Sequence, residues 1–165
     1  MMINLTPNLN EYSLNLNDIN ERKVMNDRSL DELELLVREI VDEYMTWYKQ
    51  NNLDVAKFKT FGEQANFATN TPYVKRNAKS GKLEIIWVYW LYFRKDKKYV
   101  PRVLPKGRTG KYTLKKIIKG MPDWQIKSTS RTFDALSIIE NQSDFYHQNN
   151  KAIKRLLNKQ RQLLM

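Results

Sequence analysis

The 165-residue chain contains no cysteine, and this absence excludes several kinds of chemistry. Disulfide bonds, thiolate metal sites and a cysteine nucleophile are all ruled out. One histidine, His147, cannot by itself build a histidine-rich metal centre or a pair of imidazole catalysts. No apolar run approaches the roughly 18 residues that a membrane-spanning helix needs. No signal-peptide pattern opens the chain either, so we expect a cytoplasmic protein.

Positive charge is abundant, and it is concentrated in the second part of the sequence. The chain holds 29 Lys and Arg against 18 Asp and Glu, which gives a net charge of +11. Residues 1–93 have a net charge of −2, whereas residues 94–165 have a net charge of +13. Such a concentrated excess attracts polyanions. An ordinary solvated basic surface and an anionic membrane surface are the alternatives that composition leaves open.

The first part of the chain predicts an arm followed by a helix. Residues 1–28 are rich in Asn and lack a regular apolar pattern, which is typical of a flexible or loosely docked arm. Ser29 and Glu32 fit a capping box, and apolar residues then recur at steps of three and four. We expect this helix to end at Asn51 and Asn52. The remainder, residues 29–165, is expected to form a single domain with a basic C-terminal half.

Three short runs rich in β-branched and aromatic residues predict a small sheet. They are residues 73–76, 82–93 and 99–104, and turn residues separate them. The simplest arrangement is a three-stranded antiparallel sheet (about 73–104) packed with three or four helices, an α+β fold. The middle strand is apolar on both faces. We therefore expect helices to cover both faces, the alternative being an aromatic face on which the bases of a single strand stack.

The end of the chain predicts further helices. A short helix is expected from Thr113 to Gly120, another from Asp123, and a C-terminal helix from Ser143 to Met165. The apolar stripe of the C-terminal helix can pack on its own domain or pair with a second copy to form a homodimer.

The sequence offers no convincing catalytic constellation. His147 has only Asp144 near it in sequence, and a lone histidine on a helix surface is rarely catalytic. A metal-dependent nuclease needs clustered carboxylates, and a tyrosine relaxase needs a histidine cluster for its metal. We therefore expect a protein that is not an enzyme, with no catalytic residue, no metal and no cofactor.

A dense basic segment is the strongest functional signal. Eleven cations fall between residues 94 and 119, against one acid, Asp96. These candidate DNA-binding residues are Arg94, Lys95, Lys97, Lys98, Arg102, Lys106, Arg108, Lys111, Lys115, Lys116 and Lys119. Lysines of this kind neutralise phosphates, whereas arginines also match the hydrogen-bonding edge of guanine. The segment therefore predicts double-stranded DNA as the partner, and no membrane.

A family resemblance points the same way. From Ile85 to about Asn150, an aromatic strand precedes a basic turn, then Leu104–Gly107, then Pro122–Trp124 and a helix. This order resembles the MobI-type auxiliary mobilisation proteins of conjugative plasmids and integrative conjugative elements. The resemblance implies non-catalytic binding of DNA at an origin of transfer, with a separate relaxase as partner. It assigns no role to an individual residue.

Two other classes share these features. An RNA-binding or single-stranded nucleic-acid-binding protein has the same basic and aromatic composition. A phage- or plasmid-encoded inhibitor would use a basic face to bind an acidic protein partner.

Overall fold

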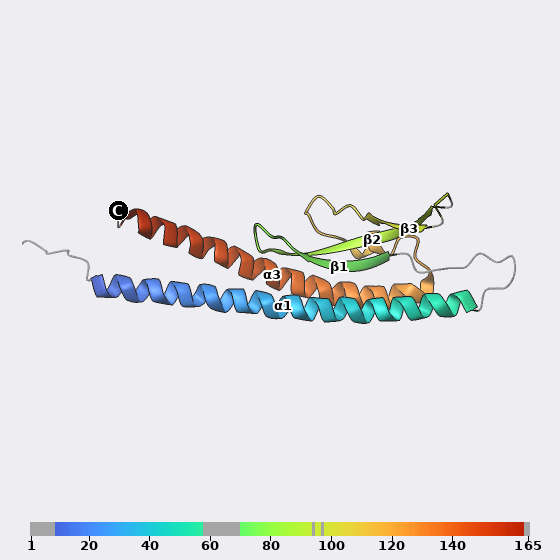
Figure 1. The fold of residues 1–165 in the computed structure, drawn as a ribbon, viewed down its shortest axis with the longest axis horizontal. Coiled ribbons are helices and arrows are strands. Elements are labelled where there is room, and N and C mark those ends of the chain that lie inside the picture. Colours follow the sequence, from blue (N-terminus) through green and yellow to red (C-terminus); the bar gives the residue numbers. More distant parts are fainter. Residues whose placement is uncertain (1–8, 58–69, 94, 97, 164–165) are drawn as a thin grey trace, which may run out of the picture.

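Two long helices and a small sheet make up the described part of the protein (Figure 1). The computed structural model describes residues 9–57, 70–93, 95–96 and 98–163. Its elements, in chain order, are α1 (Leu9–Lys57), β1 (Asn70–Arg76), β2 (Leu83–Phe93), β3 (Lys98–Val103), α2 (Leu114–Ile117) and α3 (Asp123–Leu163). The predicted α+β class with a three-stranded antiparallel sheet is confirmed.

The sheet is a simple antiparallel meander in the order β1-β2-β3. Trp87 of β2 pairs with Pro72 of β1, and Trp90 pairs with Pro101 of β3. The predicted middle strand is confirmed to within one residue at its start. β1 begins at Asn70, three residues before the expected start at Tyr73.

One face of β2 forms the centre of the hydrophobic core. Leu83, Ile85 and Trp87 alternate along the strand, and each is no more than 3% exposed. The ring of Tyr44 in α1 meets the Trp87 ring edge-on at a centroid distance of 6.1 Å. The same core takes side chains from both long helices and from α2: Val37, Val41, Ile117, Leu136 and Ile139. Burial of this face therefore joins every layer of the fold.

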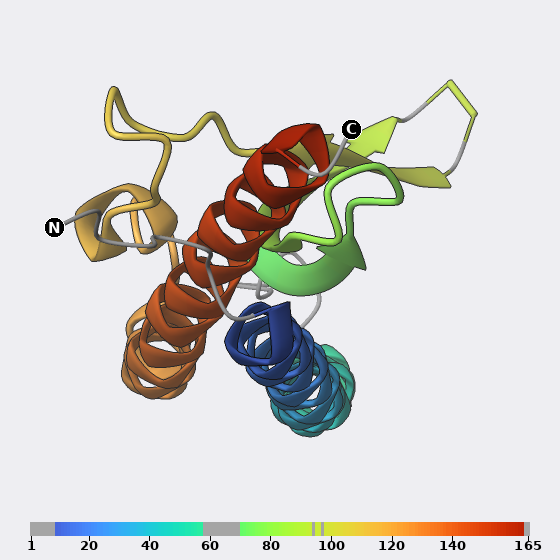
Figure 2. The same cartoon turned by 90° about the vertical axis from the view of Figure 1, so that its left-hand side faces the viewer.

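Both long helices lie on the same face of the sheet (Figure 1 and Figure 2). The expectation of helices on both faces is therefore wrong for the described part of the chain. On the other face, Val88 is buried, while Ile86 and Trp90 are half-buried. The indole Nε1 of Trp90 donates a hydrogen bond to Thr71 Oγ1 at 3.0 Å.

Buried polar groups connect all the helices to β1. The Tyr44 hydroxyl donates to the Asn70 carbonyl oxygen at 3.1 Å and lies 2.9 Å from Thr129 Oγ1. Gln125 Nε2 donates to the Tyr44 oxygen at 2.9 Å, and Asn70 Nδ2 donates to the Ile117 carbonyl at 2.6 Å. Because unpaired polar groups are costly in a core, this network fixes the helices relative to one another.

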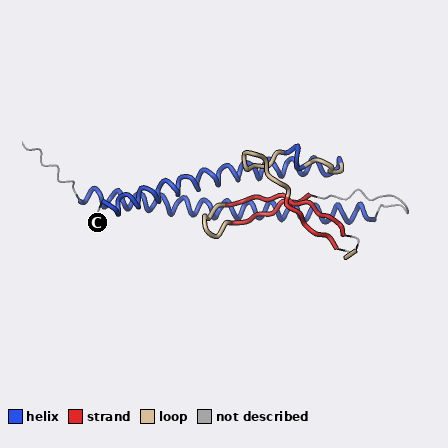
Figure 3. The backbone as a smooth tube through the Cα atoms, turned by 90° about the horizontal axis from the view of Figure 1, so that it is seen from above, coloured by secondary structure: helices blue, strands red, loops and turns tan. Residues whose placement is uncertain are grey.

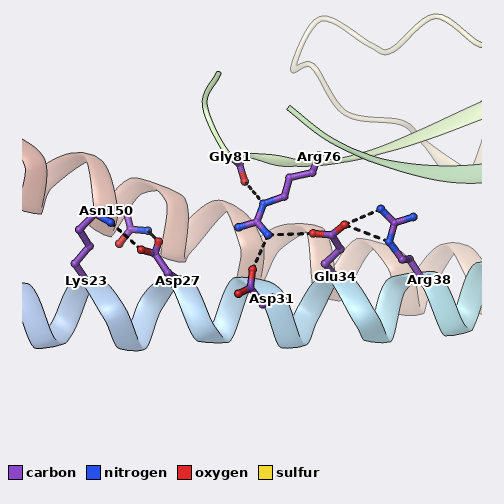
Figure 4. Close-up of polar contacts among 8 residues, drawn as sticks. All are labelled: Lys23, Asp27, Asp31, Glu34, Arg38, Arg76, Gly81 and Asn150. Atoms are coloured by element: carbon purple, nitrogen blue, oxygen red, sulfur yellow. Dashed lines mark hydrogen bonds and ion pairs between the residues drawn. The ribbon is translucent and has the colours of Figure 1, made fainter. Parts of the chain in front are cut away.

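α1 is much longer than the sequence predicted. The expected start at Ser29 and end at Asn51 and Asn52 are both wrong, because α1 runs unbroken from Leu9 to Lys57. Asn is a poor helix former, but contacts with α3 stabilise this part of α1. Asn150 of α3 donates to Asp27 at 2.7 Å (Figure 4). Asn150 also accepts a hydrogen bond from Asn26 at 3.2 Å. The division into an arm at 1–28 and a domain at 29–165 stays a prediction.

The two helices expected from Asp123 and from Ser143 are one continuous helix, α3. Leu136, Ile139, Ser143 and His147 are buried at steps of three and four, so the buried stripe crosses the expected boundary without a break.

Replacing Leu136 with Ala should lower the free energy of unfolding by roughly 2–5 kcal/mol, because Leu136 is 1% exposed and its removal leaves a cavity. Val24→Ala is the control, since Val24 is 67% exposed and should change stability by less than about 0.5 kcal/mol. Urea unfolding at one protein concentration measures both. Equal losses for the two variants would contradict this core.

Candidate nucleic-acid interface

The segment from β3 through α2 is basic and free of acidic residues. Residues 98–119 contain eight Lys and Arg and no Asp or Glu. In Figure 2, α3 lies between α2 and α1. Residues 31–43 of α1 carry six acidic side chains and one basic side chain. The lysines of α2 and the acidic residues of α1 therefore lie on different sides of α3.

The basic loop between β3 and α2 (residues 104–113) forms ion pairs with two carboxylates of α3. Lys106 Nζ lies 3.8 Å from Glu140, and Lys111 Nζ lies 3.4 Å from Asp144. Lys82, in the turn before β2, also reaches Asp144, at 2.9 Å. Ion pairs therefore attach this loop to α3, a helix that begins later in the chain.

These contacts shift the protonation of both carboxyls. Burial raises the pKa of Glu140, and the positive charge of Lys106 opposes that rise. Burial alone would raise the pKa of Asp144 as well, but the hydrogen bond from Lys82 and the charge of Lys111 hold that pKa below its usual value. Asp144 is therefore fully ionised at neutral pH, which maintains its pairs with Lys82 and Lys111.

The loop itself adopts a defined turn. Gly110 has φ +73°, a left-handed conformation that glycine adopts without strain. Its amide donates to the Gly107 carbonyl at 2.9 Å, and the Gly107 amide donates to the Lys111 carbonyl at 2.9 Å. Tyr112 closes the loop by donating from its hydroxyl to the Leu104 carbonyl at 2.9 Å.

α2 presents lysines around one buried residue. Ile117 is fully buried, whereas Lys115 and Lys119 are exposed and Lys116 is half-buried. Thr113 occupies the N-cap position, but its side chain makes no capping hydrogen bond. The expected end at Gly120 is wrong by three residues, because α2 ends at Ile117 with Ile118 as its C-cap. Gly120 lies in the turn that follows, with a left-handed φ of +76°.

The structure divides the predicted DNA-binding residues into two groups. Arg94 and Lys97 lie outside the described residues. The first group belongs to the β2–β3 hairpin: Lys95, Lys98 and Arg102. The second group belongs to the loop and α2: Lys106, Arg108, Lys111, Lys115, Lys116 and Lys119. Figure 3 shows the end of the hairpin and α2 on opposite sides of the sheet.

Ion pairs separate the anchoring cations from the others. Lys98 lies 3.8 Å from Asp96, and Lys106 and Lys111 pair with α3. The remaining cations between residues 98 and 119 form no ion pair in the described part of the chain: Arg102, Arg108, Lys115, Lys116 and Lys119. These five side chains are the ones whose charge is available to a partner.

Sequence reasoning missed Lys82 as part of this region. It lies far from Lys111 in sequence, yet both side chains contact Asp144. The available signal was the spacing of Glu140 and Asp144, which places two acids on one face of a helix in an otherwise basic part of the chain.

Among the described residues, no group of three or more His, Cys, Asp or Glu side chains is arranged to hold a metal ion. Burial, assisted by the charge of Lys151, lowers the pKa of His147, so its imidazole is neutral at pH 7. No helix in the described ranges has the length and apolar character needed to cross a bilayer.

Comparisons of the chain with protein-family models, with curated proteins and with solved structures find no match. The resemblance to MobI-type mobilisation proteins therefore stays a prediction.

Asp144→Asn should weaken the attachment of the basic loop, with a loss of about 1 kcal/mol in the free energy of unfolding at pH 7. The pKa of Asp144 is lower in the folded protein than in the unfolded chain, so its stabilising effect is present above about pH 4 and disappears as the pH falls further. Urea unfolding between pH 3 and pH 7 measures the difference between the two proteins.

Asp134→Asn is the matched control, because Asp134 is exposed on the same helix and makes no ion pair among the described residues. It should unfold like the wild-type protein throughout. A loss for Asp144→Asn that persists undiminished at pH 3 would mean that the carboxylate charge is not the cause.

Proposed function

We propose that this protein is a non-catalytic DNA-binding protein that contacts duplex DNA through residues 98–119. The observation that supports the proposal is the acid-free basic segment, whose α2 end is separated by α3 from the acidic part of α1 (Figure 2). A polyanion approaching this side meets only positive side chains from that segment, whereas the α1 side repels it.

The lysines of α2 contact the phosphate backbone in this proposal. Lys115 and Lys116 lie on α2 and Lys119 in the turn that follows it, and none of the three forms an ion pair in the described part of the chain. Each phosphate that such a lysine neutralises releases counterions, so affinity falls steeply with salt.

The arginines contact bases in this proposal. Arg102 lies on the edge strand β3, and Arg108 lies in the turn stabilised by Gly107 and Gly110. Both side chains are exposed. A guanidinium group can donate two hydrogen bonds to guanine, which lysine cannot do with the same geometry.

A narrower role is the second level of the proposal. On the resemblance to MobI-type proteins, the DNA is an origin of transfer and the protein assists a separate relaxase during conjugative mobilisation. This role requires access to intracellular DNA, so the proposal assigns the protein to the cytoplasm.

The triple variant Lys115→Ala, Lys116→Ala, Lys119→Ala should weaken duplex binding and flatten its salt dependence. If all three side chains contact phosphate, the slope of log K against log salt should become less negative by about 2.7. Fluorescence anisotropy with one labelled duplex at several salt concentrations measures the slope.

The control is Arg28→Ala, Arg38→Ala, Lys49→Ala, which removes the same charge from α1. It should leave the slope unchanged, because those side chains lie on the acidic helix. Equal effects of the two triple variants would show that only net charge matters and would contradict an interface at residues 98–119.

Arg102→Ala should reduce the preference for the best duplex sequence by roughly 1–3 kcal/mol while leaving nonspecific binding nearly unchanged. Competition with a selected duplex, an unrelated duplex, single-stranded DNA and RNA measures this difference. Tighter binding of single strands or RNA than of duplex DNA would favour the other nucleic-acid class, and no binding at moderate salt would favour the protein inhibitor.

A further inference from the structure

The face of the helix pair that lies opposite the sheet is apolar in its middle. Met25 and Leu36 of α1 are 68% and 44% exposed, and Phe145 and Leu156 of α3 are 62% and 51% exposed. Two hollows between the helices contain them. One is lined by Leu36 and Phe145, and the other by Met25 and Leu156. Large apolar side chains gathered in this way are typical of an interaction surface.

On each helix these apolar residues belong to a stripe of positions along one face. On α3, Ile138, Phe145 and Ala152 recur at steps of seven, and Leu156 continues the same line. On α1 the corresponding line is Met25, Ser29, Glu32 and Leu36, at steps of four and three, with apolar side chains at its two ends and polar ones between them. This spacing keeps side chains on one face of a helix and matches the seam of helices that pack side by side. The large apolar side chains of both stripes are exposed, so the sheet covers neither of them.

Charged residues of opposite sign lie at the two ends of these stripes. On α1 the stripe continues to Asp18 at one end and to Glu43 at the other, both acidic and exposed. On α3 it continues to Lys159 and Arg131, both basic and exposed. None of these four side chains forms an ion pair in the described part of the chain.

Contacts between α1 and α3 of one chain place the acidic and basic ends of the two stripes at matching heights along the helix axes. Asn26 of α1 lies beside Asn150 of α3, and the helices are antiparallel. Equal steps outward from that contact bring Asp18 close to the level of Lys159 and Glu43 close to the level of Arg131.

We propose that a second copy of this chain covers this face, so that the protein is a homodimer with four long helices at its centre. A two-fold axis parallel to the helices places α1 of each copy against α3 of the other in the same register. Glu43 then faces Arg131 of the second copy, and Asp18 faces Lys159. The apolar stripes meet between these charged ends.

The size of the face fits this arrangement. The stretch of α1 from Asp18 to Glu43 is about 38 Å long at 1.5 Å per residue, and two adjacent helices are about 20 Å wide. The face therefore measures roughly 760 Å², close to the about 800 Å² per partner of a standard interface. A nucleic acid is a poor occupant, because it would cover apolar side chains with phosphate.

Sedimentation velocity of the full chain without DNA tests the proposal. We expect a dimer in the micromolar range, and Met25→Glu should raise its dissociation constant at least about tenfold by burying a charge. Val24→Glu is the matched control, since Val24 is 67% exposed, adds the same charge and does not line the hollow. It should leave dimerisation unchanged. A wild-type monomer at 100 μM, or equal effects of the two variants, would overturn the proposal.

A charge swap tests the pairing of the two copies. Glu43→Arg and Arg131→Glu should each weaken the dimer, and the double variant should recover most of the lost affinity. Circular dichroism of each variant verifies that the helices remain folded. A dimer that persists with no recovery in the double variant would contradict this register. Because no DNA is present, failure here leaves the proposed function untouched.

Discussion

The buried face of β2 is the constraint on which the rest of the structure depends. Leu83, Ile85 and Trp87 are almost completely enclosed by side chains from both long helices and from α2. Because successive side chains on a strand point to opposite faces, this burial places α1 and α3 together on one side of the sheet. The face of the helix pair that is turned away from the sheet is thereby left uncovered. The packing of both helices on one face of the sheet therefore determines where the proposed DNA-binding surface and the proposed dimer surface lie.

Ion pairs then attach the sheet and the basic loop to different helices. On the α1 side, Arg76 of β1 contacts Asp31 and Glu34 (Figure 4). The hydrogen bond to Asp31 is the main cause of the raised pKa of Arg76. On the α3 side, Lys82 and Lys111 share Asp144. Exposed pairs contribute little stability individually, but these fix the direction in which the remaining cations point. Asp31 and Glu34 of α1 thus contact the sheet, whereas Lys115 and Lys116 of α2 form no ion pair in the described part of the chain.

The elements with strong local patterns could be predicted from the sequence. The helix boundaries that depend on tertiary contacts could not. The unbroken apolar run of β2 and the turns around it identified the sheet. The start of α1 was missed because the Asn-rich segment has neither high helix propensity nor a clear apolar period. Part of its support comes from hydrogen bonds of Asp27 and Asn26 to Asn150, more than a hundred residues away. The eleven clustered cations were visible in the sequence. The ion pairs of Lys106 and Lys111 with carboxylates of α3 were not, and these pairs neutralise part of the positive charge of the segment.

Lysine acetylation read by mass spectrometry, with and without a bound duplex, tests the central claim most directly. The account predicts that DNA slows acetylation of Lys115 and Lys119 and leaves Lys49 of α1 unchanged, although all three side chains are exposed in the free protein. Equal protection of Lys49 and the α2 lysines, or protection of Lys49 alone, would contradict a basic surface separated from the acidic helix.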